Sequence, residues 1–436
     1  MKKMVKRSIA FFLSLALAIP LFGCNSKASK NSSSSGKTTL TFLTLSDWPD
    51  EGLSTVIKEY EKENPNVAVK LETYSADQLS QIIEVKLGTK SDKYDVVSVD
   101  APKVAAYTQR GYLLPMDKYF TADEKKQLTN TSVATGSWQG KFMAPPMDSS
   151  SQLLFYNKDL LKAAGVAFPS SDVSKRMTYE EVLADAEKVQ KAVDPKGNKG
   201  IYGFMLEQVN MPYQVDALPN SLGGKCIGSD VFAVDGVINT TPWIKAMTFY
   251  SDLFNKYKVS GKGIGANNVG NYFRSGKVAF LVGGTWNVTE AKINFGYTLN
   301  PYFKDGKPAT PTDSWHFAIA KNSKHADEAA KFIKYMSIGK GADRWFELDG
   351  IVPSKVSLLT SIQTDKKYKS SPQSAYRLAA YEEMHAANPR PVTPGYSEWE
   401  DVMKNTFEDI RNGEAPAAAL NKAVSQINTA MTKYKK

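Results

Sequence analysis

Between residues 38 and 100, short apolar runs alternate with segments in which apolar residues recur every three or four positions. These two patterns are typical of strands and of amphipathic helices. They predict strands at residues 39–45, 67–74 and 94–100, separated by helices around residues 53–60 and 79–87. Because strands that alternate with helices form a mostly parallel sheet, we expect an α/β fold with binding residues at the carboxyl ends of the strands.

The middle of the chain continues this alternation. The pattern predicts a turn, a strand and a helix within residues 140–166, and within residues 276–288 a strand that ends in two glycines and a tryptophan. The pattern of residues 194–206 predicts a Gly-rich turn that leads into a strand. Asp194 and Asn198 are spaced as in a calcium loop, but the further acids of such a loop are missing, so we interpret this segment as a plain turn. The last third is predicted to be mainly helical, and no fixed-period repeat indicates a solenoid or propeller.

The N-terminus has the features of a secretion signal. Four basic residues precede an apolar stretch at residues 9–22, which is shorter than the roughly 20 residues that a membrane-spanning helix needs. The segment LFGC, which ends in Cys24, resembles the bacterial lipobox, with a phenylalanine where a small residue is usual. In that motif the cysteine is acylated and becomes the new N-terminus. We therefore expect a signal peptide at residues 1–23 and a flexible tether at residues 24–37, and the alternative is an uncleaved signal anchor.

The net charge of +10 invites an interpretation as a nucleic-acid-binding protein. Seven basic residues and no acid lie within residues 1–37, however, so the remaining residues carry only +3. No basic run with interleaved aromatic residues follows, so we expect no nucleic-acid partner. If Cys24 carries lipid, Cys226 has no cysteine to pair with, and the stability of the protein must come from a large core instead of a disulfide.

Five segments, taken in chain order, are similar to the family of extracellular solute-binding proteins that serve ABC importers. The similarity is to the branch that contains maltodextrin-binding and other sugar-binding proteins. The segments are residues 94–120, 140–166, 276–288, 317–355 and 390–428.

This resemblance implies an α/β, two-lobed fold like that of periplasmic binding proteins, with three hinge crossings. We expect the crossings near Asp148, Asp313 and Ile351. The N-terminal lobe would comprise residues 38–148 plus 313–350, and the C-terminal lobe residues 149–312 plus 351–436.

Sugar sites combine aromatic platforms for the apolar faces of the ring with polar side chains for its hydroxyl groups. Trp286 matches the tryptophan that follows the Gly pair in the family, and Tyr213 matches the aromatic residue of its Pro-Tyr turn. The other candidates are Trp48 and Asp47 after the first strand, Asp100 after the third, Asp148 and Ser150 at the first crossing, Tyr396 and Trp399 on the last crossover, and Trp315 beside the second crossing. The alternatives are core packing for the aromatic residues and helix N-capping for Asp47 and Asp100.

Motifs of catalysis, cofactor binding and metal binding are missing from the sequence, and its three histidines are scattered. We therefore expect a monomeric, lipid-anchored receptor without cofactor or metal, which binds a mono- or oligosaccharide and delivers it to a membrane permease. Three alternatives stay open: the same architecture binding a polyamine, metal chelate or peptide, a cell-surface glycan hydrolase, and a structural envelope lipoprotein. Arg377 and Arg390 could pair with an acidic substituent, but we expect them to form surface ion pairs.

Overall fold

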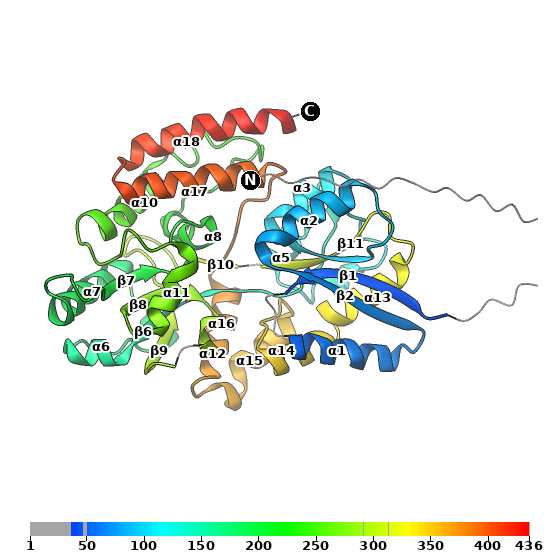
Figure 1. Ribbon diagram of the computed structural model, residues 1–436, viewed down its shortest axis with the longest axis horizontal. Helices are drawn as coiled ribbons and strands as arrows, with labels where there is room; N and C mark the ends of the chain where they lie inside the picture. Colours follow the sequence, from blue (N-terminus) through cyan, green and yellow to red (C-terminus); the bar gives the residue numbers. More distant parts are fainter. Residues whose placement is uncertain (1–35, 47–49, 291, 313, 436) are drawn as a thin grey trace, which may run out of the picture. The chain divides into compact units, whose positions relative to one another are not determined.

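Two four-stranded sheets are present in the part of the chain that the computed structural model describes, residues 36–435 without 47–49, 291 and 313 (Figure 1). The first has the order β11-β3-β1-β2 and is formed by β1 (Thr38–Leu45), β2 (Val67–Tyr74), β3 (Val96–Asp100) and β11 (Trp315–Ile319). The second has the order β7-β8-β6-β9 and is formed by β6 (Gln152–Asn157), β7 (Tyr202–Leu206), β8 (Val278–Gly284) and β9 (Phe295–Leu299). The strands predicted from the sequence are therefore confirmed.

The first sheet is buried on both faces because side chains of β1 alternate between two cores. Leu40 and Phe42 pack with α1, α13 and α14, whereas Leu43 and Leu45 pack with α2 and α3. Each such side chain contributes about 1.5–3 kcal/mol when it is removed from water. The helices of this part are α1 (Asp50–Glu63), α2 (Ala76–Gly88), α3 (Val104–Gln109), α4 (Ala122–Lys125), α5 (Asn130–Thr135), α13 (Ala326–Ser337) and α14 (Lys340–Asp349).

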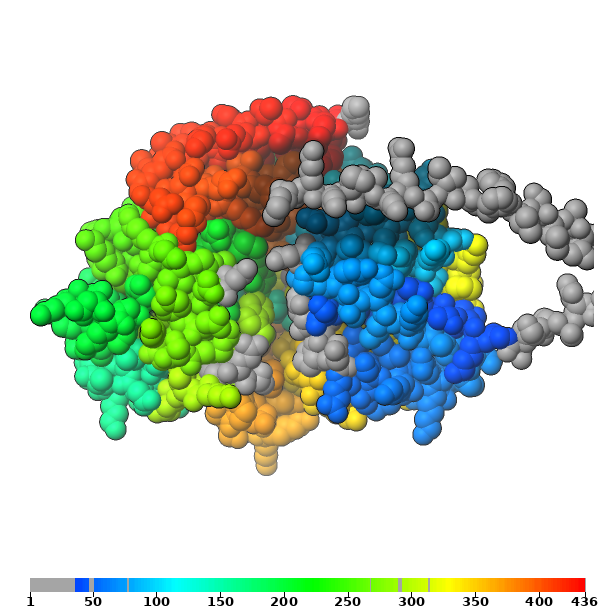
Figure 2. All heavy atoms as spheres, in the orientation of Figure 1, coloured from blue at the N-terminus to red at the C-terminus, as the bar shows by residue number. Residues whose placement is uncertain are grey.

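The second sheet lies within a larger core. All seven residues of β8 are buried, and five of them, residues 278–282, belong to that core. Helices α17 and α18, coloured orange and red in Figure 2, pack against each other and against α10. The remaining helices are α6 (Lys158–Ala163), α7 (Tyr179–Val193), α8 (Pro212–Val215), α9 (Ala217–Ser221), α10 (Thr241–Asn255), α11 (Ala266–Arg274), α12 (Asn287–Glu290), α15 (Val356–Thr364), α16 (Ser374–His385), α17 (Tyr396–Asn412) and α18 (Pro416–Met431).

The segments that connect the two sheets contact one another. The backbone N–H of Asp148 donates to the carbonyl of Trp315 at 3.3 Å, and that of Ser149 donates to the carbonyl of Val352 at 2.6 Å. A small parallel ladder joins β10 (Thr310–Thr312) to β12 (Ala387–Pro389), and a short hairpin is formed by β4 (Ser137–Trp138) and β5 (Lys141–Phe142). The connecting segments include the positions where we expect hinge crossings, but the lobe boundaries stay predictions.

Several expectations concern residues outside the described part of the chain. They are the signal peptide, Cys24, most of the tether, Asp47, Trp48 and Asp313. From Lys37 onward the chain forms one compact unit. No helix within the described ranges is long and apolar enough to cross a membrane.

Candidate functional site

Trp286 lies directly after β8, and 39% of its surface is exposed. This exposure decides against the alternative in which Trp286 caps the core. The indole lies across the end of its own strand: a Cβ atom added to Gly284 would come within 2.1 Å of the ring atom Cη2. Glycine is therefore required at position 284 for this placement of the ring, which explains the second glycine of the Gly pair.

Glu207 follows β7, the parallel neighbour of β8, so its carboxylate reaches the same edge of the sheet as Trp286. Oε1 accepts a hydrogen bond from the indole Nε1 of Trp286 at 3.0 Å, and Oε2 accepts one from the backbone N–H of Gly284 at 3.1 Å. Burial raises the pKa of Glu207, and these hydrogen bonds, together with the side chain of Asn287, partly oppose that effect. The position thus places a buried acid beneath an exposed aromatic ring.

Tyr213, in α8, lies close to this ring, with its centroid 6.3 Å from that of Trp286. The hydroxyl groups of Tyr213 and Ser150 are hydrogen-bonded at 2.7 Å, and the carbonyl of Tyr213 accepts from the side chain of Gln152 at 3.0 Å. Burial raises the pKa of Tyr213, so its hydroxyl stays protonated at neutral pH. Three residues predicted from separate segments, Trp286, Tyr213 and Ser150, are therefore brought together.

Arg390 links this group to the first sheet. Its guanidinium lies 5.3 Å from the ring centroid of Tyr213 and 5.9 Å from that of Tyr396, and it donates to both carboxylate oxygens of Asp100. Only 9% of the Arg390 side chain and 15% of the Asp100 side chain are exposed. The expectation of a surface ion pair for Arg390 is therefore wrong, because the pair is largely buried and the guanidinium lies near two aromatic rings. The side chain of Asp100 forms no N-cap hydrogen bond to the short helix that follows it, so the capping alternative is not observed.

The other predicted site residues differ in how far they are buried. Trp315 is half-buried at the start of β11, opposite Asp100 in the ladder. Its backbone N–H donates to Oδ1 of buried Asp148 at 2.9 Å. Tyr396 and Trp399 are completely buried in the core of the second sheet, where their rings stack with centroids 5.9 Å apart. Trp399 is thus a packing residue here, which is the alternative considered from the sequence.

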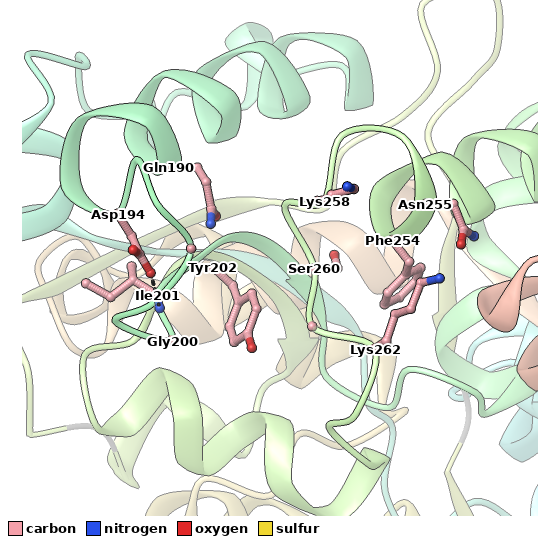
Figure 3. Close-up of a pocket in the computed structure, with 12 residues that line it drawn as sticks. Gln190, Asp194, Gly200, Ile201, Tyr202, Phe254, Asn255, Lys258, Ser260 and Lys262 are labelled. Atoms are coloured by element: carbon pink, nitrogen blue, oxygen red, sulfur yellow. Dashed lines mark hydrogen bonds between the residues drawn. The ribbon is translucent and has the colours of Figure 1, made fainter.

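A separate surface cavity of about 380 Å³ lies between α7, β7 and the end of α10, and none of the predicted site residues lines it (Figure 3). Asp194 lines this cavity, and its carboxylate accepts hydrogen bonds from the backbone N–H groups of Asn198, Lys199 and Ile201. The carboxylate therefore organises a turn, as expected from the sequence. In the described part of the chain, no group of three His, Cys, Asp or Glu side chains is arranged to hold a metal ion.

Comparison with known proteins places the chain in a family. The model of bacterial extracellular solute-binding proteins matches residues 47–337. The chain belongs to this family. It is therefore an extracellular solute-binding protein and not an enzyme, which decides against the alternative of a glycan hydrolase.

Individual relatives match over almost the whole chain. The maltodextrin-binding protein MdxE of Bacillus subtilis is 25% identical, over 97% of this chain and 97% of the relative. A maltooligosaccharide ABC transporter solute-binding lipoprotein of Streptococcus pneumoniae is 23% identical, over 98% of this chain and 97% of the relative.

A solved structure confirms the predicted fold class. The ABC substrate-binding protein of Listeria monocytogenes in complex with cycloalternan superposes with a TM-score of 0.76 at 22% identity, over 91% of this chain and 99% of that chain. The protein thus has the α/β fold of periplasmic binding proteins.

Two residues of this region were missed or misjudged from the sequence. Glu207 could have been found by the rule that selected Asp100, because it directly follows the carboxyl end of a recognised strand. Arg390 offered no such signal, since its partner Asp100 lies 290 positions earlier in the chain.

Proposed function

We propose that the protein is a lipid-anchored receptor, which binds a mono- or oligosaccharide between two lobes and delivers it to the permease of an ABC importer. The observation that carries this proposal is the exposed indole face of Trp286, held beside Tyr213 at the edge of the second sheet. An aromatic face of this kind suits the apolar C–H surface of a sugar ring. The relatives whose names refer to maltodextrin and maltooligosaccharide support the same class of solute.

The proposed site joins residues of both expected lobes. Trp286, Tyr213 and Ser150 belong to the lobe of residues 149–312 plus 351–436, whereas Asp100 and Trp315 belong to the lobe of residues 38–148 plus 313–350. A solute that contacts both groups makes all its contacts only when the lobes close, so binding shifts the population toward the closed state. We include Asp148, Asp47 and Trp48 as further candidates, and Tyr396 as a support for Arg390.

The acidic groups favour a sugar over a polyamine. A polyamine site needs several carboxylates that are available to ammonium groups, but both oxygens of Asp100 accept from Arg390, and Asp148 accepts from a backbone N–H. Asp100 is thus neutralised by Arg390 and Asp148 is buried, which disfavours a polycation, whereas sugar hydroxyl groups can both donate and accept.

A lipid on Cys24 would keep the receptor at the membrane while the tether at residues 24–37 lets it reorient, which raises its local concentration at the importer. Mass spectrometry of the mature protein tests this part of the proposal. The expected N-terminal residue is a diacylglyceryl-modified Cys24, and an unmodified cysteine would contradict the anchor without affecting the binding proposal.

Thermal-shift measurements on residues 38–436 test the proposed solute. The panel contains monosaccharides, maltose, maltotriose, galactose-containing oligosaccharides, spermidine and short peptides. Because a ligand that binds only the folded state stabilises it by mass action, a sugar at 100 times its Kd should add about 2.7 kcal/mol to the stability and raise the melting temperature. A shift with spermidine or a peptide and with no sugar would show that the proposal of a carbohydrate is wrong.

A further inference from the structure

Two of the hydrogen bonds that the carboxylate of Glu207 accepts come from the exposed ring and from the strand beneath it. One comes from the indole of Trp286 and the other from the backbone of Gly284, the strand residue over which the ring is placed. Since only 7% of Glu207 is exposed, its oxygens are directed toward the protein, and a carboxylate left without these donors would be costly to bury. The acid therefore acts on the ring and on its support at the same time.

The Gly pair makes room for this arrangement in two separate ways. A Cβ atom at Gly283 would lie 2.8 Å from Oε2 of Glu207, and a Cβ atom at Gly284 would collide with the indole. The side chain of Asn287 donates to the carbonyl of Gly284 at 3.2 Å, which fixes the turn after β8. The first glycine thus accommodates the acid and the second accommodates the ring.

We infer that Glu207 is a positioning residue, which holds the indole of Trp286 as a preformed platform before the solute arrives. This inference rests on the proposed function for its role in binding, although the positioning itself concerns the solute-free protein. A side chain that is ordered only by the solute loses rotamer freedom on binding, whereas a ring that is already held does not. Glu207 thereby increases affinity without contacting the sugar.

The variant Glu207→Gln tests this role with little change in volume. A carboxylate offers two acceptor oxygens, but an amide offers one oxygen and one NH₂ group, so the variant must lose the hydrogen bond to Trp286 or the one to Gly284. The measurement is the indole ¹⁵N–¹H signal of Trp286 in the solute-free protein, assigned with the variant Trp286→Phe. We expect its hydrogen exchange to become at least tenfold faster in Glu207→Gln, or the ring to become measurably more mobile.

A pH titration separates positioning from general support of the fold. In the wild type the indole shift of Trp286 should follow the ionisation of Glu207. Burial raises the pKa of Glu207, and the charge of Arg274 on α11 opposes this together with the hydrogen bonds to the carboxylate; in Glu207→Gln the inflection should be lost. The matched control is Asp349→Asn, because the indole of Trp345 donates to Asp349 at 3.0 Å in α14. The control should alter the Trp345 signal and leave that of Trp286 unchanged. An unchanged exchange rate, mobility and titration of Trp286 in Glu207→Gln would overturn the inference.

The sugar that gives the largest thermal shift then tests the consequence for binding. We expect its affinity for Glu207→Gln to fall about fivefold, and an unchanged affinity would overturn the role of Glu207 in binding. If no sugar binds the wild type, the proposed function fails, while the indole measurements still decide whether Glu207 positions the ring.

Discussion

Trp286 exposes a large apolar ring although indole is among the side chains whose removal from water is most favourable. We therefore expect Trp286→Ala to weaken binding of the sugar at least tenfold by isothermal titration calorimetry without unfolding the protein. Its melting temperature should fall, because the buried carboxylate of Glu207 loses its indole donor. The control Phe168→Ala removes another exposed aromatic ring, 50% of which is accessible, and should retain the affinity. Equal affinities for Trp286→Ala and the wild type would remove Trp286 from the site.

Single residues could be predicted from the sequence where the signal is local. Trp286 follows a recognisable apolar strand and a Gly pair, and the structure places it at the strand's end as expected. Trp399 is also a tryptophan and lies near Tyr396 in a segment that resembles the family, yet it is completely buried. Whether a helix position faces the core or solvent depends on its neighbours in space. The buried partnership of Arg390 with Asp100 depends on the tertiary fold and could not be predicted from either segment.

Strands could likewise be predicted where the signal is local, but not where they form through contacts between distant segments. Strand β8 begins with five consecutive apolar residues, and the valines of β3 are interrupted only by Ser98, so the pattern alone was sufficient to predict both strands. The ladder of β10 and β12 was not predicted, because each strand has three residues, both contain proline, and their pairing joins positions 77 residues apart, such as Thr310 and Ala387. Short strands of this kind form only when the surrounding fold brings them together.

Helix α16 carries a buried acid, Glu382, which accepts hydrogen bonds from Arg176 and from the residue that follows β9. Arg176 donates to Glu382 at 2.7 Å, and the backbone N–H of Asn300 donates to the same carboxylate at 2.8 Å. Burial raises the pKa of Glu382 from 4.5 to about 7, against the opposing effects of Arg176 and Asn300. Because the carboxyl group ionises more readily in the unfolded chain, its contribution to stability is fully present below pH 4.5 and is lost as the pH rises toward 7.

Urea unfolding at pH 5 and pH 8 measures this effect for α16. We expect Glu382 to account for about 2 kcal/mol of the stability that the wild type loses between these pH values, and the variant Glu382→Gln should not show this part of the loss. The exposed Glu187, on α7, provides the control, since Glu187→Gln should behave as the wild type. A pH dependence in Glu382→Gln equal to that of the wild type would contradict the prediction.

At the scale of the whole molecule, the pair of Asp100 and Arg390 connects the parts that contain the two four-stranded sheets of the described chain. Asp100 ends a strand of the first sheet, while Arg390 packs against Tyr213 of α8 and Tyr396 of α17. The sequence resemblance predicted the α/β fold, but not this link, because the relative placement of the sheets depends on contacts between residues far apart in the chain. In a receptor that closes around its solute, such a link changes the balance between open and closed states before any solute binds.

We expect Arg390→Met and Asp100→Asn to shift this balance toward the open state, because each variant leaves a buried group without its charged partner. The methionine still packs near the rings of Tyr213 and Tyr396, so the main loss is the ion pair, and each variant should lower the stability by about 3 kcal/mol. Small-angle scattering should give a larger radius of gyration for each solute-free variant than for the wild type. When sugar is added, the radius of gyration should decrease more in the variants than in the wild type.

The double variant Asp100→Asn/Arg390→Met should be no more expanded than either single variant, because the two residues act through one contact. The control is Lys126→Met, which removes the same charge from an exposed ion pair with Asp123 on the surface near α4. Unchanged dimensions in Arg390→Met and Asp100→Asn would show that the ion pair does not govern lobe closure, and equal expansion in Lys126→Met would assign the change to net charge.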